Sequence, residues 1–265
     1  MSIPLIVCKL GGSVLTRKRD GLPELDRPAL RRIAGELRRA LAERALRLVL
    51  IHGVGAYGHS LVAETGIAEG LRLPEDLPAF LRAHLSVAGL NLRLAEFFHE
   101  AGLPILPLSP AALFELDRKA IVTAHLAPIE FALETLAAIP LLHGDMVPDR
   151  TLGGAVLSGD LILAYLSRVL RADLALLGTD VDGVFDRDPR LDPTARLLER
   201  LPDPQNPAAD VSGSTATDVT GGMGGKLAAL ARELSGIPAW IFNLEAPDRL
   251  FRLLTGRSCP GTRIG

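Results

Sequence analysis

Histidines and glycines gather at one point of this chain in a way that suits phosphate chemistry. The stretch HGVGAYGH, residues 52–59, places three glycines between two histidines, directly after the apolar run LVLI at 48–51. Because glycine has no side chain, its backbone N–H can approach an anion closely. Histidine can donate a hydrogen bond to a phosphate oxygen. The segment is therefore a candidate anion-binding loop.

The lysines point to the same chemistry. The chain has only four lysines beside 25 arginines, and three of the four flank glycine clusters. Lys9 and Lys18 lie on either side of Gly11-Gly12-Ser13, and Lys226 ends the run GGMGGK at 221–226. A coding bias toward arginine accounts for the many arginines on the surface. Lysine, however, is a compact, mobile cation suited to phosphate oxygens. Glycine and lysine together predict a polyphosphate site.

The familiar nucleotide motifs do not fit. A P-loop requires a glycine five positions before the Gly-Lys pair and Ser or Thr after it, whereas Thr220 and Leu227 occupy those positions. No GxGxxG follows the first predicted strand, and the protein-kinase motif set is missing from the sequence. The phosphate-binding groups must be arranged differently.

Short apolar strands alternate with longer amphipathic helices along the chain, which is typical of a parallel-sheet α/β fold. In such sheets, ligands bind beyond the carboxyl ends of strands and at helix N-termini. Six glycine turns occupy such places: KLGGS at 9–13, HGVGAYGH at 52–59, HGD at 143–145, SGD at 158–160, TDVDG at 179–183 and GGMGGK at 221–226.

The predicted strands are 3–10, 47–51, 104–108, 139–143, 174–177 and 239–242, with a hairpin at 145–156. The predicted helices are 27–44, 77–101, 128–138, 160–171, 226–234 and 247–254, and 186–210 reads as irregular.

Composition excludes several classes of protein. A chain of 265 residues, 48% of them hydrophobic, can bury a large core. Its net charge of −2 lacks the basic surplus of nucleic-acid-binding proteins. Two cysteines, Cys8 and Cys259, form neither a metal-ligand pattern nor a disulfide framework, so no protein-held metal is predicted. No basic leader opens the chain and no apolar run reaches the ~18 residues of a membrane span, so we expect a cytoplasmic protein without nucleic-acid or membrane partners.

The motifs resemble those of the amino acid kinase superfamily and, within it, the isopentenyl phosphate kinases. KLGGSVLTRK, HGVGAYGH, HGD, SGD, TDVDGV and DVTGGMGGK occur in the family order between residues 9 and 226. KLGGS and TDVDG are shared across the superfamily, whereas His59 is typical of the subfamily. The resemblance implies an α/β fold, an open αβα sandwich with a mainly parallel central sheet. It also implies a single domain over 1–265, with an acceptor-binding lobe at about 1–170 and a nucleotide-binding lobe at about 171–265, and usually a homodimer.

The reaction that the resemblance implies is phosphoryl transfer from ATP, used with Mg²⁺, to isopentenyl phosphate. The product is isopentenyl diphosphate, in an alternative mevalonate route. The small-molecule phosphate is itself the nucleophile, so no strong base is needed. Catalysis would depend on in-line positioning and on neutralising charge. Magnesium would bind to the ATP phosphates.

The resemblance also implies roles for single residues. Backbone amides at 53–55 would cradle the acceptor phosphate and the transferring group, and His59 would donate a hydrogen bond to the acceptor's non-reacting oxygens. Lys9 would lie between the two phosphates, Lys18 would stabilise the transferring group, and these two with His59 form the catalytic set. Asp145 and Asp160 would orient lysines or metal-bound water. The predicted acceptor contacts are Gly53, Val54, Gly58, His59 and Gly159, and the predicted ATP contacts are Lys9, Gly11, Gly12, Ser13, Gly55, Thr179, Asp180, Asp182, Gly222 and Lys226.

The chain departs from the family pattern in the acceptor region. Val54 stands where the family usually has glycine, and Tyr57 replaces a usual phenylalanine. The organic tail of the acceptor would meet an apolar lining, although helical spacing fits core packing equally well. That lining would consist of Leu73, Leu77, Phe80, Leu81 and Leu85. Of the remaining histidines, His52 and His143 are interpreted as satisfied buried residues, and His84, His99 and His125 as ordinary helix or loop residues.

Three alternatives stay open on the sequence. A phosphonate kinase resembling fosfomycin kinase shares the histidine-terminated glycine loop. A kinase for a carboxylate acceptor, such as glutamate, would not call for His59. A non-catalytic oxyanion-storage protein could use the same fold, but it would not need Lys9, Lys18 and Lys226 together.

Overall fold

The computed structural model describes residues 3–20, 22–57, 67, 70–187, 192, 194–201, 233–234 and 236–264. Four predicted site residues lie outside these ranges, as does most of the predicted helix at 226–234. Those four are Gly58, His59, Gly222 and Lys226.

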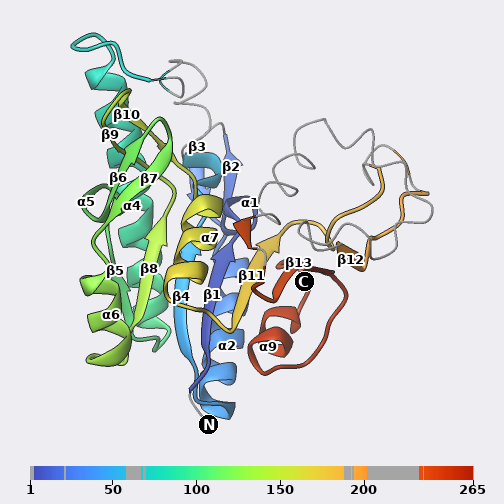
Figure 1. Ribbon diagram of the computed structural model, residues 1–265. Coiled ribbons are helices and arrows are strands. Elements are labelled where there is room, and N and C mark those ends of the chain that lie inside the picture. The colour runs from blue at the N-terminus through green and yellow to red at the C-terminus, as the bar shows by residue number, and fades with distance from the viewer. Residues whose placement is uncertain are drawn as a thin grey trace.

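An eight-stranded sheet runs through the molecule in the order β12-β14-β13-β11-β1-β4-β8-β5 (Figure 1). All neighbouring strands are parallel except β13 and β14. The mainly parallel sheet predicted from the sequence is therefore confirmed. The strands are β1 (Leu5–Leu10), β4 (Arg47–His52), β5 (Ile105–Pro107), β8 (Ile139–His143), β11 (Leu174–Thr179), β12 (Arg200–Leu201), β13 (Ala239–Asn243) and β14 (Thr262–Ile264).

Helices cover both faces of this sheet, because its central strands are apolar on both sides. In β1, Leu5 and Val7 pack into one buried cluster and Ile6 and Cys8 into another. The first cluster includes side chains of α6 (Ala127–Glu134) and α7 (Gly159–Val169). The second includes side chains of α2 (Arg27–Glu43), α4 (Leu77–Glu100) and α9 (Arg249–Leu254). In Figure 1, α7 lies in front of the sheet and α2 behind it, which gives the three layers of an αβα sandwich.

Smaller elements extend from the sandwich. A four-stranded sheet, β10-β9-β6-β7, holds the predicted 145–156 hairpin, and β2 and β3 form a second hairpin. The sequence analysis missed the β2–β3 hairpin, the β6–β7 pair and β14. The elements are α1 (Gly12–Leu15), β2 (Thr16–Arg19), β3 (Leu22–Leu25), η1 (Gly55–Tyr57), α5 (Pro110–Leu113), β6 (Phe114–Asp117), β7 (Ala120–Ala124), β9 (Asp145–Asp149) and β10 (Gly153–Leu157). Among the described residues, no helix is both long and apolar enough to cross a membrane.

A buried carboxylate links the two ends of the chain. Glu36 on α2 is only 3% exposed and accepts hydrogen bonds from the backbone N–H groups of Asp248 and Phe251, each at 3.1 Å. These amides belong to the N-terminal turn of α9, whose free N–H groups need acceptors. Arg32 donates to the same carboxylate from one turn earlier in α2. The predicted acceptor-binding half thus caps a helix of the predicted nucleotide-binding half.

Candidate active site

The carboxyl ends of β1, β4 and β11 meet at one edge of the sheet, and the candidate site lies there. Lys9 pairs in register with Ile51 of β4 on one side and Leu177 of β11 on the other. The backbone N–H of Gly53 donates to the carbonyl of Leu10 at 2.9 Å, so the pairing continues past the end of β4. Two of the predicted glycine turns are therefore brought directly together.

These turns pack backbone against backbone, which requires glycine. A Cβ atom added to Gly12 would lie 2.7 Å from the Cα of Gly55 and 2.8 Å from the carbonyl carbon of Gly53. Gly55 also has a φ of +48°, a conformation that side chains disfavour. A Cβ on Gly11 would lie 2.7 Å from the carbonyl oxygen of Gly178, at the end of β11. Close packing alone is thus a sufficient reason for these glycines, whatever anion the loops bind.

One hydroxyl bridges the two turns. Thr16 is 4% exposed, and its Oγ1 donates to the carbonyl of Gly12 at 2.8 Å. The same oxygen accepts from the backbone N–H of Ala56 at 2.9 Å. A Cβ on Gly55 would collide with this hydroxyl. Thr16 therefore fixes the spacing between the two loops.

Lys9 is held by the start of α7. Its Nζ lies 2.6 Å from Oδ1 of Asp160, and the two side chains are 19% and 39% exposed. Gly159, the first residue of α7, sits beside this lysine: a Cβ there would lie 3.6 Å from Cε of Lys9. Ser158 caps the helix by accepting from the N–H of Leu161. The expectation that Asp160 orients a lysine agrees with this geometry.

Lys18 lies on a different element from Lys9. The helix α1 separates the two lysines, and Lys18 is exposed on β2. The β2–β3 hairpin packs against η1, the short helical turn that carries Gly55. Ser13, another predicted ATP contact, is exposed on α1. The predicted acceptor loop therefore lies between β1, which carries Lys9, and the hairpin that carries Lys18.

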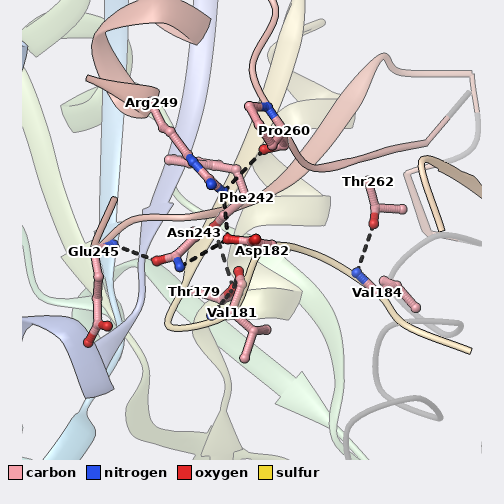
Figure 2. A network of polar contacts seen from close by, with 10 residues as sticks. All are labelled: Thr179, Val181, Asp182, Val184, Phe242, Asn243, Glu245, Arg249, Pro260 and Thr262. Atoms are coloured by element: carbon pink, nitrogen blue, oxygen red, sulfur yellow. Dashed lines mark hydrogen bonds and ion pairs between the residues drawn. The ribbon is translucent and has the colours of Figure 1, made fainter. Parts of the chain in front are cut away.

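On the nucleotide side, side chains make the connections (Figure 2). The Asp182 carboxylate lies between Arg249, whose guanidinium donates at 2.7 Å, and Asn243, whose amide donates at 3.1 Å. Thr179 donates from its Oγ1 to the carbonyl of Val181 at 2.9 Å. These contacts fix the TDVDG turn against the end of β13 and the start of α9. Thr179 ends β11, Asp180 and Asp182 follow it, and Asp182 already has two protein partners.

Buried histidines lie behind the acceptor loop. His52 and His143 end the neighbouring strands β4 and β8, and their rings stack with centroids 5.3 Å apart. Each Nδ1 donates to the carbonyl of the following residue, Gly53 or Gly144, at 3.1 and 3.0 Å. Burial lowers the pKa of both histidines to about 4. Both are buried, as expected, and uncharged near neutral pH. The expectation that both are satisfied is wrong for His52, whose buried Nε2 has no hydrogen-bond partner among the described residues.

A histidine from α4 joins this group. Nδ1 of His84 lies 2.9 Å from Oδ1 of Asp145, whose carboxylate is fully buried. Burial raises the pKa of Asp145, while the nearby His143 and His84 act against that rise. The sequence analysis classed His84 as an ordinary residue and expected Asp145 to orient a lysine or water. Instead, the pair fastens α4 to the start of β9.

The apolar tail lining is wrong in most of its members. Leu73, Leu77, Leu81 and Leu85 are 59%, 42%, 45% and 67% exposed, so they neither line a closed pocket nor pack in the core. The last three recur every four residues of α4, so they lie on one exposed face of the helix. Phe80 alone turns inward, where a Cβ on Gly154 of β10 would lie 2.6 Å from its ring. Phe80 remains the candidate for contact with an organic tail.

Several residues that matter to this geometry carried no assigned role in the sequence analysis. Thr16 stands inside the quoted motif KLGGSVLTRK, so the motif marked its position but not its use. His84 and Arg249 have partners 61 and 67 residues away, and no local pattern indicates such pairs. Tyr57 is also anchored, since Ser86 donates to its carbonyl at 2.9 Å and Arg93 to its hydroxyl at 3.3 Å.

The acidic side chains near the site bear on how a metal ion could bind there. Within the residues that the structure describes, no three His, Cys, Asp or Glu side chains meet at a distance that would hold an ion. Asp160 and Asp182, which lie next to the site, are each paired with a cation, Lys9 and Arg249 respectively. Single carboxylates suit Mg²⁺ that arrives with phosphate oxygens, since Mg²⁺ commonly binds one or two carboxylates plus a substrate's phosphates.

Known proteins resemble this chain over nearly its whole length. The model of the amino acid kinase family matches residues 4–243. An isopentenyl phosphate kinase of Methanothermobacter thermautotrophicus is 35% identical over 271 aligned residues, and the match covers 98% of each chain. Another, from Methanocaldococcus jannaschii, is 30% identical and is covered to the same extent. A crystal structure of an isopentenyl phosphate kinase superposes with a TM-score of 0.82 at 32% identity, covering 98% of this chain and 100% of the other.

Both the sequence and the three-layer architecture thus agree with the resemblance that the motifs suggested. The chain belongs to the amino acid kinase family and groups with its isopentenyl phosphate kinases.

Proposed function

We propose that this protein transfers the terminal phosphoryl group of ATP to isopentenyl phosphate, giving ADP and isopentenyl diphosphate. The observation that carries the proposal is the junction at Lys9. This single cation lies on the strand between the acceptor loop that follows β4 and the TDVDG turn that follows β11. Full-length relatives at 35% and 30% identity are isopentenyl phosphate kinases, which supports this acceptor over phosphonates and carboxylates.

The chain's own residues would act by placement and charge. Backbone N–H groups at 53–55 would hold the acceptor phosphate, beside Gly159 at the start of α7. Lys9 would lie between the acceptor and ATP, with Asp160 keeping its ammonium group in place. Lys18 and His59 would bind the transferring and acceptor phosphates. Interactions that strengthen as charge moves between the two phosphates lower the barrier selectively.

ATP would contact the glycine turn at 11–13, the TDVDG turn and the run at 221–226. Asp182 would face the nucleotide while Arg249 and Asn243 hold its inner oxygen. Mg²⁺ would be carried by the ATP phosphates and would neutralise part of their charge. The division into an acceptor-binding lobe up to about residue 170 and a nucleotide-binding lobe beyond it remains part of this proposal, as does a cytoplasmic location.

A homodimer belongs to the proposal as well. The exposed leucines of α4, Leu77, Leu81, Leu85 and Leu92, form an apolar stripe on the outer face of a 24-residue helix. Such a stripe is unusual on a monomer surface and suits a second copy of the chain. Light scattering on Leu85→Glu against the parent protein tests this: the parent is expected at twice the chain mass of 28.2 kDa, and the variant at or near a single chain.

A substrate panel tests the acceptor. Purified protein is assayed for ADP release with isopentenyl phosphate, dimethylallyl phosphate, fosfomycin and acetylglutamate, with and without Mg²⁺. We expect kcat/KM to be largest for isopentenyl phosphate, and no turnover without a divalent ion. A larger kcat/KM for fosfomycin or acetylglutamate would refute the proposed acceptor, and no turnover with any of them would favour a storage protein.

His59 offers a second test of the acceptor site. A charge-assisted hydrogen bond to phosphate is worth about 1.5 to 3 kcal/mol, so His59→Ala should lower kcat/KM for the acceptor roughly ten- to a hundredfold with little change in the KM of ATP. His59→Gln should retain more activity than His59→Asn, because its longer side chain can still donate. If Asn exceeds Gln and the losses follow thermal stability, His59 is a helix cap rather than a phosphate donor.

A further inference from the structure

Thr16 is the only described side chain that bonds to both glycine turns of the candidate site. Its hydroxyl is buried, donates to the carbonyl of Gly12 and accepts from the N–H of Ala56. A hydroxyl can do both at once because it has one donor hydrogen and two acceptor lone pairs. The backbone joins the two turns at their start, where the N–H of Gly53 donates to the carbonyl of Leu10 at 2.9 Å. The hydroxyl of Thr16 adds a second connection further along both turns, between Gly12 and Ala56.

The position of Thr16 in the chain gives this bridge a second effect. It is the first residue of β2, two residues before Lys18. The carbonyl of Leu15 accepts from the N–H of Asp26, which closes the base of the β2–β3 hairpin, and that hairpin packs against η1. One buried hydroxyl therefore stands where the Lys9 turn, the acceptor loop and the Lys18 hairpin meet.

We infer that Thr16 is a positioning residue for phosphoryl transfer: it sets the distance between the loop that would hold the acceptor and the turn that would hold ATP. The inference rests on the proposed function. Transfer requires the acceptor oxygen and the leaving ADP oxygen to lie in line on either side of the phosphorus, and small displacements there are costly. Losing the bridge should therefore reduce kcat more than it changes either KM.

A misplaced acceptor loop also changes the product. The bond between the terminal phosphorus and the ADP oxygen still breaks, but water can supply the new oxygen in place of the acceptor phosphate. ATP and water then give ADP, inorganic phosphate and a proton. The ratio of phosphate released to phosphorylated acceptor thus reports the alignment of the loops, which a loss of folding stability alone would not change.

The test compares Thr16→Val, which keeps the shape and removes the hydroxyl, with Thr16→Ser, which keeps the hydroxyl. We expect Thr16→Val to lower kcat roughly ten- to a hundredfold. Its ratio of hydrolysis to transfer should rise several-fold, and the backbone amide of Ala56 should exchange with deuterium at least about tenfold faster. Thr16→Ser should stay within about threefold of the parent in all three measurements.

Thr262 provides a matched control in the nucleotide-binding half. It too is a buried threonine whose Oγ1 accepts from a backbone amide, that of Val184, at 2.7 Å (Figure 2). A Cβ on Gly183 would collide with it, just as one on Gly55 would collide with Thr16. Thr262→Val should lower the melting temperature to a similar degree and leave the ratio of hydrolysis to transfer unchanged.

Three results would overturn the inference: a Thr16→Val protein with parental kcat, a Thr16→Ser protein as impaired as Thr16→Val, or the same rise in hydrolysis from Thr262→Val. If the parent protein did not phosphorylate isopentenyl phosphate, the proposed substrate would fail first. The exchange rate of the Ala56 amide in Thr16→Val and Thr16→Ser would still decide whether the hydroxyl holds the loop.

Discussion

The two sides of the candidate site are built in different ways. On the proposed acceptor side, the loop at 53–55 touches the turn at 11–13 through its backbone, and a single added carbon on Gly12 or Gly55 would collide with the neighbouring segment. On the nucleotide side, the TDVDG turn is held by side chains, with Asp182 shared between Arg249 and Asn243. Backbone contact permits almost no adjustment, whereas a side-chain network can lose one member and repack. The acceptor side should therefore respond to substitution abruptly and the nucleotide side gradually.

Gly12→Ala gives the largest effect that this comparison predicts. The added carbon would lie 2.7 Å from the Cα of Gly55, so one of the two turns must move. We expect kcat/KM for isopentenyl phosphate to fall about a thousandfold, equivalent to more than about 4 kcal/mol. Steady-state kinetics and a melting curve measure it.

Gly35→Ala is the control for that substitution. Gly35 lies within α2, and a Cβ there has no neighbour within 4 Å. Alanine in a helix interior is worth about 0.5 to 1 kcal/mol over glycine, so this variant should be more stable with unchanged kinetics. A Gly12→Ala protein within threefold of the parent in kcat/KM would mean that the acceptor side is not rigid.

Lys18→Ala sharpens the comparison, because Lys18 lies on an exposed hairpin rather than in the packed turns. Its removal should leave the fold intact and affect chemistry alone. We expect kcat to fall about a hundredfold with little change in the KM of ATP, since a cation engaged mainly in the transition state is worth a few kcal/mol. Lys119→Ala, far along the chain on a turn, serves as the control. An unchanged kcat would remove Lys18 from the catalytic set.

Acid should lower the free energy of unfolding through the buried histidines next to the acceptor loop. Burial lowers the pKa of His52 from 6.5 to about 4, so the folded protein favours the neutral ring. The stability due to this preference is complete above pH 6.5 and is lost as the pH falls from 6.5 toward 4, by about 3 kcal/mol for this fully buried group. The pKa of His143 is lowered in the same direction. Because the two rings repel each other when charged, their contributions to the free energy of unfolding do not simply add. Asp145, with its raised pKa, favours the folded state more as the pH falls and partly opposes the loss.

Urea unfolding at pH 7, 6, 5 and 4.5 measures the effect. His52→Gln should lose stability at pH 7 but show a flatter dependence on pH, whereas the exposed His99→Gln should behave as the parent does. A parent protein whose free energy of unfolding stays constant from pH 6.5 to 4.5 would contradict the assignment.

The comparison can also be applied within α4, between its inner and outer faces. Phe80→Ala should improve kcat/KM for geranyl phosphate relative to isopentenyl phosphate roughly ten- to a hundredfold, because an apolar site discriminates by volume at about 1 to 3 kcal/mol per methylene. The neighbouring Leu81→Ala should leave this ratio unchanged, since that side chain is 45% exposed. Equal losses for both substrates in Phe80→Ala, with a lower melting temperature, would make Phe80 a core residue only.

The smallest effects are expected on the nucleotide side. Asp182→Asn and Arg249→Met each remove a part-exposed ion pair, and such pairs are worth at most about 1 kcal/mol. We expect the KM of ATP to rise about threefold in each variant, with the KM of the acceptor unchanged. The double variant should lose less than the sum of the two, because the partners share one network. Strict additivity, or a change confined to the acceptor, would show that this network does not serve ATP.

The sequence predicted those helices and strands that can be recognised from their own residues alone. The strands at 5–10, 47–52 and 139–143 are apolar runs, and α2 and α4 are amphipathic over several turns, so periodicity found them. The β2–β3 hairpin was not predicted, because half of its strand residues are charged and half are exposed, so apolar and polar residues do not alternate along it. β14 has three residues and is defined by its pairing with β13 and β12, whose paired residues lie more than twenty residues earlier in the chain.

The residues of the candidate site also fall into two groups, those that local sequence predicted and those that it did not. Glycine turns at strand ends were predictable, because parallel strands bring their carboxyl ends to one edge of the sheet. The partners of Thr16, His84 and Arg249 were not, since they lie 40, 61 and 67 residues away in the chain. The leucines of α4 were misplaced because helical spacing identifies a common face but not the direction in which it points.

The place of β1 in the sheet has a consequence for how the protein is made. β1 leaves the ribosome well before β11, which is one of its two neighbours in the sheet, so Ile6 can pair with Leu174 only after a long delay. The backbone N–H of Leu5 likewise bonds to Asp173, 168 residues later. At the usual pace of synthesis, about 5 to 20 residues per second, roughly ten to thirty seconds pass before that partner emerges. Lys9 lies on this strand, so its surroundings are completed only when about two-thirds of the chain has been translated, and the nascent protein carries an open apolar edge until then.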